Sequence, residues 1–219
     1  SDVCSSDLCP NLFIYNSSLT KGMYPLLESV WPEVKKIIPE AKLLVVGGYY
    51  RNLQEGLTVD PSEVKYNDLY TKYHNKNDVM FTGIITQKEI SNILEKYTFL
   101  LYPADFPETY GISTLEDINY NVLPITCRHG ALEEVASEKV SYLINYDIKH
   151  DTNQLQRFIH QVHRAYIDTY LKQQKQYACN EFKPYITWES IALQWKYHFY
   201  KKFNLYMNIG ELRKVKDII

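Results

Sequence analysis

Short apolar runs and amphipathic stretches alternate along the chain. Runs that are apolar at nearly every position are typical of parallel strands covered by helices on both faces. Strands are predicted at 11–15, 42–48, 79–83, 98–103, 122–126 and 141–146. Helices are predicted at 25–38, 86–97, 111–120, 130–136, 152–177 and 187–203. This order favours an α/β fold, a Rossmann-like parallel sheet with helices on both faces and further helices at the C-terminal end.

Local signals refine several of these elements. Pro25 suits a first helical turn, whereas Pro32 is expected to kink the helix that contains it. Thr86 with Glu89 three positions later predicts a capping box, and Thr187 is expected to begin the last helix. Residues 49–77 have no clean hydrophobic period and are expected to form a long excursion.

Length and composition exclude several classes of protein. With 219 residues, 45% of them hydrophobic, the chain is long enough for one large domain or a compact pair. We expect a Rossmann-like domain over 9–150 with helices 151–219 packed on it, and we set residues 1–8 aside as a non-native, adapter-derived segment. The net charge of −2 argues against nucleic acid as a partner. No apolar run has the roughly 20 residues of a membrane-spanning helix.

Cysteine and histidine positions give no metal site. The four cysteines, at 4, 9, 127 and 179, are irregularly spaced and include no C-x-x-C pair. A reduced, cytoplasmic compartment is the expectation from this usage. His160 and His163 lie three positions apart on a predicted helix, but no third ligand accompanies them.

In a parallel α/β sheet, ligands bind at the carboxyl ends of the strands. This rule directs attention to the loops 16–22, 47–51, 83–86, 103–111 and 127–131, all of which follow predicted strands.

The stretch DFPETYGISTLEDINYN, residues 105–121, combines several features of a ligand site. Gly111 stands between a strand-end loop and a helix, where unsatisfied backbone amides and the helix dipole favour a phosphate. Glu108 precedes the helix and Glu116 lies within it, so the two carboxylates can reach different hydroxyls of one elongated ligand. Their separation by seven residues is not informative alone, because Glu55/Glu63 and Glu181/Glu189 share it.

The loop YNSSLTKG, residues 15–22, supplies a candidate cation. Lys21 stands among small residues at the end of the first strand, where an ammonium group can reach a diphosphate. A solvated surface lysine is the alternative interpretation.

Taken together, these segments resemble the C-terminal half of a glycosyltransferase family 4 enzyme of the GT-B fold. PETYGISTLE is similar to the family's E-P-F-G-x-x-x-L-E signature, and Lys21 with Gly22 matches its K/R-G turn. PEAKLLVVGG, NDVMFTGIITQKEISNIL and VLPITCRHGALEEVA resemble further family segments in the family's order. The resemblance covers about residues 11–136 and continues more weakly to about 200.

The resemblance implies a retaining transfer of a hexosyl group from a UDP- or GDP-sugar, without cofactor or catalytic metal. It implies Glu108 and Lys21 as catalytic residues, which bind the donor sugar and the leaving diphosphate, and Glu116 as the ribose ligand. Further donor-binding residues would be Tyr110, Gly111, Ile112, Ser113, Gly22, Gly83, Ile84, Arg128 and His129. The two glutamates are not interpreted as the acid and nucleophile of a glycoside hydrolase.

Three positions depart from the family pattern. Asn16 stands where many members carry an arginine, Asn121 replaces a glycine and Asp117 replaces an alanine. Arg51 or Arg128 could supply the phosphate contact that the arginine makes. Asn121 can still adopt a left-handed backbone as a helix cap.

Because a GT-B enzyme has two Rossmann-like halves, we expect this chain to be a fragment that lacks the N-terminal, acceptor-binding half and is inactive alone. Membrane contact of the whole protein stays open. A non-catalytic nucleotide-sugar-binding or scaffolding module is the alternative. A nicotinamide-dependent oxidoreductase is disfavoured, because G-x-G-x-x-G is missing. The aromatic series Trp188, Trp195, Phe199 and Phe203 is expected to pack in the core or against the other half.

Overall fold

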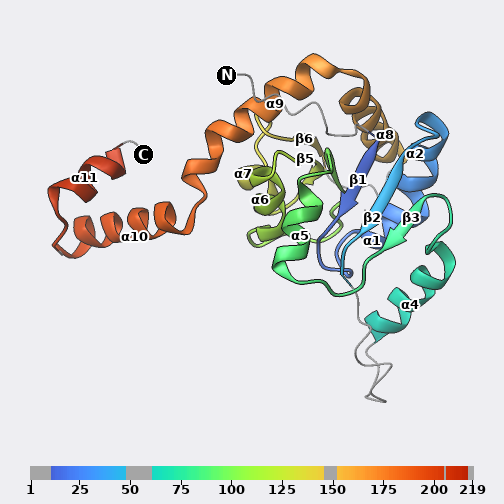
Figure 1. The fold of residues 1–219 in the computed structure, drawn as a ribbon, viewed down its shortest axis with the longest axis horizontal. Helices are drawn as coiled ribbons and strands as arrows, with labels where there is room; N and C mark the ends of the chain where they lie inside the picture. Colours follow the sequence, from blue (N-terminus) through green and yellow to red (C-terminus); the bar gives the residue numbers. More distant parts are fainter. Residues whose placement is uncertain (1–10, 48–60, 146–151, 205, 217–219) are drawn as a thin grey trace.

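A computed structural model describes residues 11–47, 61–145, 152–204 and 206–216 of the chain. Its strands are β1 (Leu12–Tyr15), β2 (Lys42–Val45), β3 (Val79–Phe81), β4 (Phe99–Tyr102), β5 (Leu123–Arg128) and β6 (Tyr142–Asn145). They form one parallel sheet in the order β3-β2-β1-β4-β5-β6 (Figure 1). This is the doubly wound order of a Rossmann-like fold, so the predicted fold class is confirmed.

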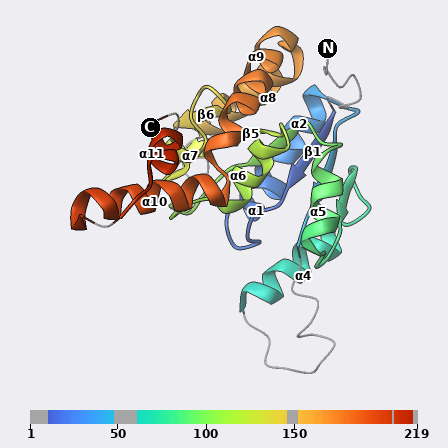
Figure 2. The ribbon, with the colours of Figure 1, turned by 60° about the vertical axis from the view of Figure 1, so that its left-hand side comes forward.

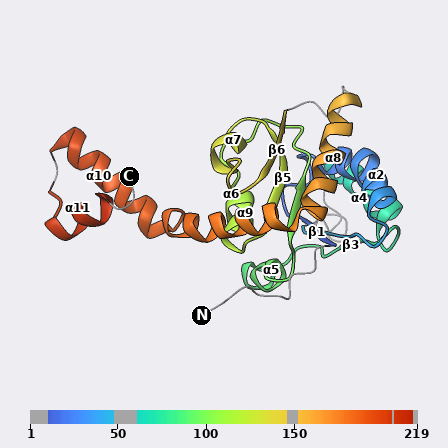
Figure 3. The ribbon, with the colours of Figure 1, turned by 90° about the horizontal axis from the view of Figure 1, so that it is seen from above.

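Helices cover both faces of this sheet. They are α1 (Met23–Pro25), the π-helix η1 (Leu26–Val30), α2 (Trp31–Ile37), α4 (Pro61–Tyr73), α5 (Gln87–Leu94), α6 (Ile112–Asn119), α7 (Leu132–Val135), α8 (Thr152–Ile167), α9 (Thr169–Phe182), the 3-10 helix η2 (Lys183–Tyr185), α10 (Trp188–Phe203) and α11 (Ile209–Lys216). Seen from above, α2, α4 and α8 lie on one side of the sheet, and α5, α6, α7 and α9 lie on the other (Figure 3). The chain therefore passes from one face to the other between α8 and α9, beside the edge strand β6.

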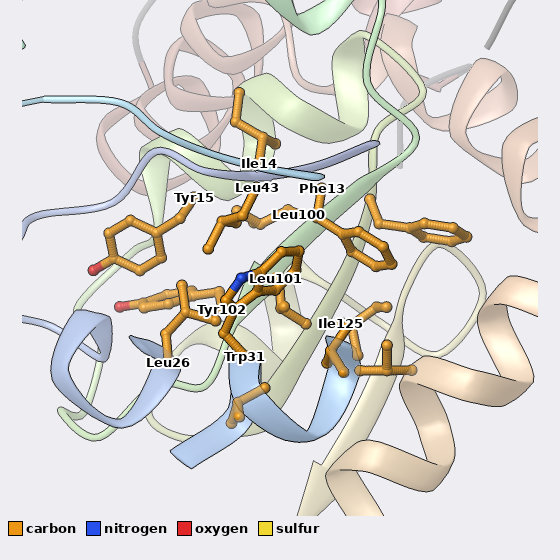
Figure 4. Packing of buried hydrophobic residues seen from close by; sticks show 14 of the residues in the cluster. Phe13, Ile14, Tyr15, Leu26, Trp31, Leu43, Leu100, Leu101, Tyr102 and Ile125 are labelled. Atoms are coloured by element: carbon orange, nitrogen blue, oxygen red, sulfur yellow. The ribbon is translucent and has the colours of Figure 1, made fainter. Parts of the chain in front are cut away.

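The core forms where the apolar strands meet the helices that follow β1. Phe13 stacks on Phe99 with 5.5 Å between ring centroids. The rings of Trp31 and Phe13 meet edge to face, with 6.0 Å between their centroids, and both residues are labelled in Figure 4. Trp31 is buried, and its indole N–H donates a 2.9 Å hydrogen bond to the carbonyl of Asn77. Burial of such large aromatic side chains is the main stabilising contribution to a domain of this size.

Several predictions differ from the structure. The helix predicted over 187–203 is α10 but is not the last helix, because α11 follows it. Residues 61–73, assigned to an irregular excursion, form α4, in which Tyr66, Leu69 and Tyr73 are buried at helical spacing. Tyr66 meets Phe81 of β3 edge to face, at 6.0 Å between ring centroids. The prediction of an irregular excursion was therefore wrong over this range. It missed the helix because tyrosines, which were not counted as apolar, form most of its buried face. Residues 49–60 of the predicted excursion lie outside the described residues.

The helix predicted over 152–177 is two helices. Asp168 ends α8 and caps α9, since its carboxylate accepts a 2.9 Å hydrogen bond from the amide of Leu171. Pro32, expected to kink a helix, lies in the first turn of α2 directly after the π-helix η1. Asn121 adopts the predicted left-handed backbone, with φ of 62°.

The last helices form an arm beside the sheet domain. In two views α10 and α11 extend away from the sheet (Figures 1 and 3), and a third view shows the two helices side by side (Figure 2). Lys196 of α10 and Glu211 of α11 form an ion pair at 2.6 Å. The aromatic series Trp188, Trp195, Phe199 and Phe203 is exposed, so its assignment to the core of this domain was wrong. No helix among the described residues combines the length and apolar character that crossing a membrane requires.

The predicted capping box at α5 is confirmed. The amide of Glu89 donates to the hydroxyl of Thr86 at 3.3 Å, and the amide of Thr86 donates to the Glu89 carboxylate at 2.7 Å. The reciprocal pair satisfies backbone donors that the first helical turn otherwise leaves open.

We expect Thr86→Ala to lower the free energy of unfolding by about 1 kcal/mol, because the hydroxyl cap is lost. Urea titration followed by circular dichroism measures this difference. Lys88→Ala changes an exposed neighbour on the same helix and is expected to leave the midpoint unchanged. Equal midpoints for Thr86→Ala and the wild type would contradict a stabilising role for the cap.

Candidate functional site

Two strand-end loops meet where the chain reverses its winding direction. β1 pairs with both β2 and β4, so the loops after β1 and β4 leave the sheet side by side. Ligands of open α/β sheets bind at this position. The first loop supplies Lys21 and the second supplies Glu108, and the Lys21 ammonium lies 3.0 and 3.1 Å from the two Glu108 carboxylate oxygens. The structure therefore brings together the two residues that the sequence singled out as catalytic.

Glu108 is buried, with 7% of its surface exposed, and has a second partner. The Tyr102 hydroxyl donates a 2.6 Å hydrogen bond to Glu108 Oε1. Burial, followed by the bond to Glu108, raises the pKa of Tyr102, so this hydroxyl keeps its proton and remains a donor. Tyr102 was not predicted as a site residue, because a tyrosine in an apolar strand gives no sign of where its hydroxyl points.

Tyr15 supports the other side of the pair. Its ring meets that of Tyr102 with 6.0 Å between centroids (Figure 4). Its hydroxyl shares its one proton between the carbonyls of Ser18, at 2.7 Å, and Lys21, at 2.5 Å. These bonds hold the loop after β1 in the shape that directs Lys21 toward Glu108. Burial also raises the pKa of Tyr15.

Two glycines permit the close approach of these loops. Gly22 has φ of 84°, and a Cβ there would lie 2.6 Å from the carbonyl oxygen of Pro103. Gly130 has φ of 65°, and a Cβ there would lie 2.3 Å from the carbonyl oxygen of Glu108. Any side chain at either position would therefore push the loops apart. Gly130 was missed as a site residue, since only the three-dimensional contact reveals its function.

The loop after β5 fixes the backbone of Glu108. The Glu108 amide donates to the carbonyl of His129 at 3.4 Å, and the amide of Ala131 donates to the carbonyl of Glu108 at 2.8 Å. Thus His129 contributes through its backbone. Arg128 forms ion pairs with Glu133, at 2.6 Å, and with Glu138, so its charge is already matched by two carboxylates.

The first turn of α6 presents backbone donors. Gly111 caps this helix in a left-handed conformation with φ of 82°. The first backbone bond of the helix runs from Leu115 to the Gly111 carbonyl at 3.1 Å, so the amides of Ile112 and Ser113 precede it. Tyr110 and Ile112 have exposed side chains. This turn can bind an anion through its amides and the helix dipole.

Glu116 lies on α6 next to the loop that follows β3. Gln87, the first residue of α5, donates a 2.9 Å hydrogen bond to Glu116 Oε1. Gly83 of that loop has φ of 69°, and its carbonyl accepts a bond from the Gly47 amide at 3.1 Å. The neighbouring Ile84 is exposed and available for contact with a ligand.

Two cavities lie between Tyr110 and the arm formed by α10. One, of about 330 Å³, is lined by Glu116, Ile112 and Trp188, and the other, of about 600 Å³, by Trp195 and His198. Tyr110 lines both. The larger cavity does not include Lys21 or Glu108, so size alone would have directed attention away from the pair at the sheet edge.

Two of the three departures from the family pattern, Asn16 and Asp117, contact each other. Asn16, after β1, donates a 2.7 Å hydrogen bond through its amide to Asp117 Oδ1 on α6. Asp117 is fully buried, and burial raises the pKa of this carboxyl well above its ordinary value. The bond connects the loop of Lys21 to the helix that carries Glu116.

Because the folded pKa of Asp117 is raised, its contribution to stability is complete below the unfolded pKa, near 3.8, and is lost as pH rises toward the folded value. We therefore expect the wild type to lose more free energy of unfolding than Asp117→Asn between pH 4 and pH 7. The difference is about 1.4 kcal/mol for each pH unit that separates the two pKa values within that window. Urea titrations at both pH values measure it.

Asp68→Asn, which removes an exposed carboxylate on α4, serves as the control and is expected to follow the wild type. Parallel pH dependence of the wild type and Asp117→Asn would show that Asp117 is ionised in the folded protein.

Among the residues that the structure describes, no three histidine, cysteine, aspartate or glutamate side chains lie close enough together to bind a metal ion.

A search of curated proteins gives no match. Solved structures with the same fold include the pneumococcal O-GlcNAc transferase GtfA in complex with UDP and GlcNAc, at a TM-score of 0.66 and 17% identity, over 90% of this chain and 37% of that one.

Two further structures are similar. A glycosyltransferase from Rickettsia africae has a TM-score of 0.65 and 15% identity, over 92% of this chain and 49% of that one. Sucrose-phosphate synthase from Thermosynechococcus elongatus has a TM-score of 0.61 and 20% identity, over 90% and 47%. The chain thus spans less than half the length of each of these proteins. The family described as Glycosyl transferases group 1 matches residues 10–177, and the chain belongs to that family.

Proposed function

We propose that this chain is the donor-binding domain, the C-terminal half, of a retaining family 4 glycosyltransferase. The reaction would transfer a hexosyl group from a nucleoside diphosphate sugar to an acceptor. The observation that carries the proposal is the ion pair of Lys21 with Glu108 at the switch point of the sheet, on a loop that leads directly into the first turn of α6. UDP in the structure of the pneumococcal relative supports a nucleotide sugar as the ligand.

The diphosphate would bind between Lys21 and the amides of Ile112 and Ser113. Bond cleavage leaves negative charge on the diphosphate, and donors fixed in advance stabilise that charge better than water does. The Lys21 ammonium has three protons, so it can keep its bond to Glu108 while it donates to a phosphate oxygen. No metal ion is needed in this scheme, and we expect activity to persist in the presence of EDTA.

The two glutamates would hold the sugars at opposite ends of the donor. Glu108, fixed by Tyr102 and the loop after β5, would accept hydrogen bonds from hydroxyls of the transferred hexose. Glu116 would accept bonds from the ribose, since it lies beside the loop that contains Gly83 and Ile84. In the free protein Glu116 accepts a hydrogen bond from Gln87, and in the nucleotide-bound protein the ribose hydroxyls would replace Gln87 as donors. The Glu116 carboxylate would therefore have a hydrogen-bond donor in both states.

Acceptor binding would come from a second Rossmann-like half. The exposed aromatic side chains of α10, among them Trp188 and Trp195, offer an apolar surface for that half. The length comparison supports this assignment, because the chain covers 37–49% of three similar proteins.

Calorimetric titration of this chain with UDP, GDP and ADP tests donor binding directly. We expect at least one of them to bind, and Glu116→Gln to weaken that binding about tenfold, because a charged hydrogen bond to the ribose is lost. Glu189→Gln is a matched control, since Glu181 and Glu189 have the same spacing as the site pair and are exposed. Failure of all three nucleotides to bind the folded chain at millimolar concentration would refute the donor site.

Recovery of the longer reading frame tests the transfer reaction. We expect a protein with a second Rossmann-like half to transfer sugar from a nucleotide sugar, and Glu108→Gln to lower kcat by about 100-fold through loss of transition-state stabilisation. Circular dichroism verifies that this variant folds. Nucleotide-sugar binding with no transfer to acceptor or water would instead support a non-catalytic binding module.

A further inference from the structure

A further cavity, of about 210 Å³ and lined largely by polar residues, lies beside the edge strand β6, near the connection from α8 to α9. Tyr142 begins β6, so this cavity is near the amino end of that strand, whereas Lys21 and Glu108 lie at carboxyl ends. Its lining includes Arg164 of α8 and Lys175 of α9. None of the residues assigned to the donor site lines it.

Lys175 is buried, with 8% of its surface exposed, yet it has no carboxylate partner among the described residues. Its ammonium donates to the backbone carbonyl of Glu138 and lies 4.9 Å from the centroid of the Tyr142 ring. Burial lowers the pKa of Lys175. Taking an ammonium group out of water is costly unless an anion compensates it, so the side chain is unusual for a purely structural residue.

The Tyr142 hydroxyl is a second unusual group. Tyr142 is 2% exposed, and its hydroxyl has no hydrogen-bond partner within the part of the chain that the structure describes. Buried hydroxyls in folded proteins are nearly always bonded. Burial raises the pKa of Tyr142, so the hydroxyl keeps its proton and can donate.

The nearby carboxylates are engaged elsewhere. Glu138 lines the cavity, but its carboxylate binds Arg128, and Asp168 caps the amide of Leu171. Arg164 forms no ion pair with any described residue. The cavity is therefore lined by two cations that form no ion pair with a described carboxylate, and the charge of Glu138 acts on Lys175 only at longer range.

We propose that this cavity binds a phosphate group, either inorganic phosphate or a small phosphate monoester. Lys175 and Arg164 match the double negative charge of phosphate, and its oxygens can accept bonds in several directions, including one from Tyr142. The volume of about 210 Å³ is below the roughly 300–1,000 Å³ of pockets for drug-sized ligands, which excludes a whole nucleotide sugar. The site is independent of the proposed donor site.

Calorimetric titration of the full chain with inorganic phosphate, and separately with a hexose monophosphate, tests the site. We expect saturable binding, about tenfold weaker in Arg164→Gln because a charged bond is lost, and several-fold weaker in Tyr142→Phe. Tyr142→Phe keeps the ring, so the fold is expected to persist. Tighter binding of the ester identifies a monoester as the ligand, and binding of phosphate alone identifies the free ion.

Arg157→Gln is the matched control, because Arg157 is also an exposed arginine of α8 but lines a different cavity, of about 470 Å³. It is expected to bind both probes like the wild type. Lys21→Gln separates this site from the donor site: it removes any phosphate binding at Lys21 and is expected to keep the binding component that Arg164→Gln weakens. The proposal fails if neither probe binds at tens of millimolar, or if Arg164→Gln and Arg157→Gln bind alike. It also fails if Lys21→Gln alone abolishes binding.

Discussion

The pairing of β1 with β4 is the constraint on which the site depends. Phe13 lies opposite Phe99 and Ile14 opposite Leu100, although these strands are far apart in the sequence. The chain winds outward from this pair in both directions, so no helix separates the two loops at its carboxyl end. The stacked rings of Phe13 and Phe99 thus position Lys21 against Glu108 without contacting either of them.

The ion pair of Lys21 and Glu108 also compensates for the burial of the Glu108 charge. A carboxylate such as Glu108 is costly to bury unless it is bonded on several sides. Lys21 and Tyr102 provide those bonds, and Gly130 allows the neighbouring loop to approach its backbone. The contacts that stabilise Glu108 in the fold therefore also fix its direction, and the proposed role in donor binding would require such rigidity.

Much of this arrangement could be predicted from the sequence, because it depends on local signals. Apolar runs identified the six strands, Thr86 with Glu89 identified a cap, and Gly111 marked the start of α6. Tyr102 and Gly130 could not be found in this way, since their functions depend on contacts between separate loops. The helix over 61–73 was not predicted, because its buried face consists largely of tyrosines, and tyrosines also occur on polar surfaces.

The hydrogen bond between Asn16 and Asp117 gives these two of the three departures from the family pattern one physical explanation. An arginine at position 16 beside alanine would leave its charge free for a phosphate, whereas an amide beside a buried carboxyl forms a bond within the protein. Burial raises the pKa of Asp117 well above its ordinary value, so the exchange removes a positive charge from the loop while burial disfavours a negative charge on the helix. In the proposed donor site, Lys21 and the amides of α6 would then stabilise a larger share of the charge on the diphosphate. In this proposed site, the negative charge of the diphosphate would therefore be stabilised mainly by the Lys21 ammonium and the amino terminus of α6.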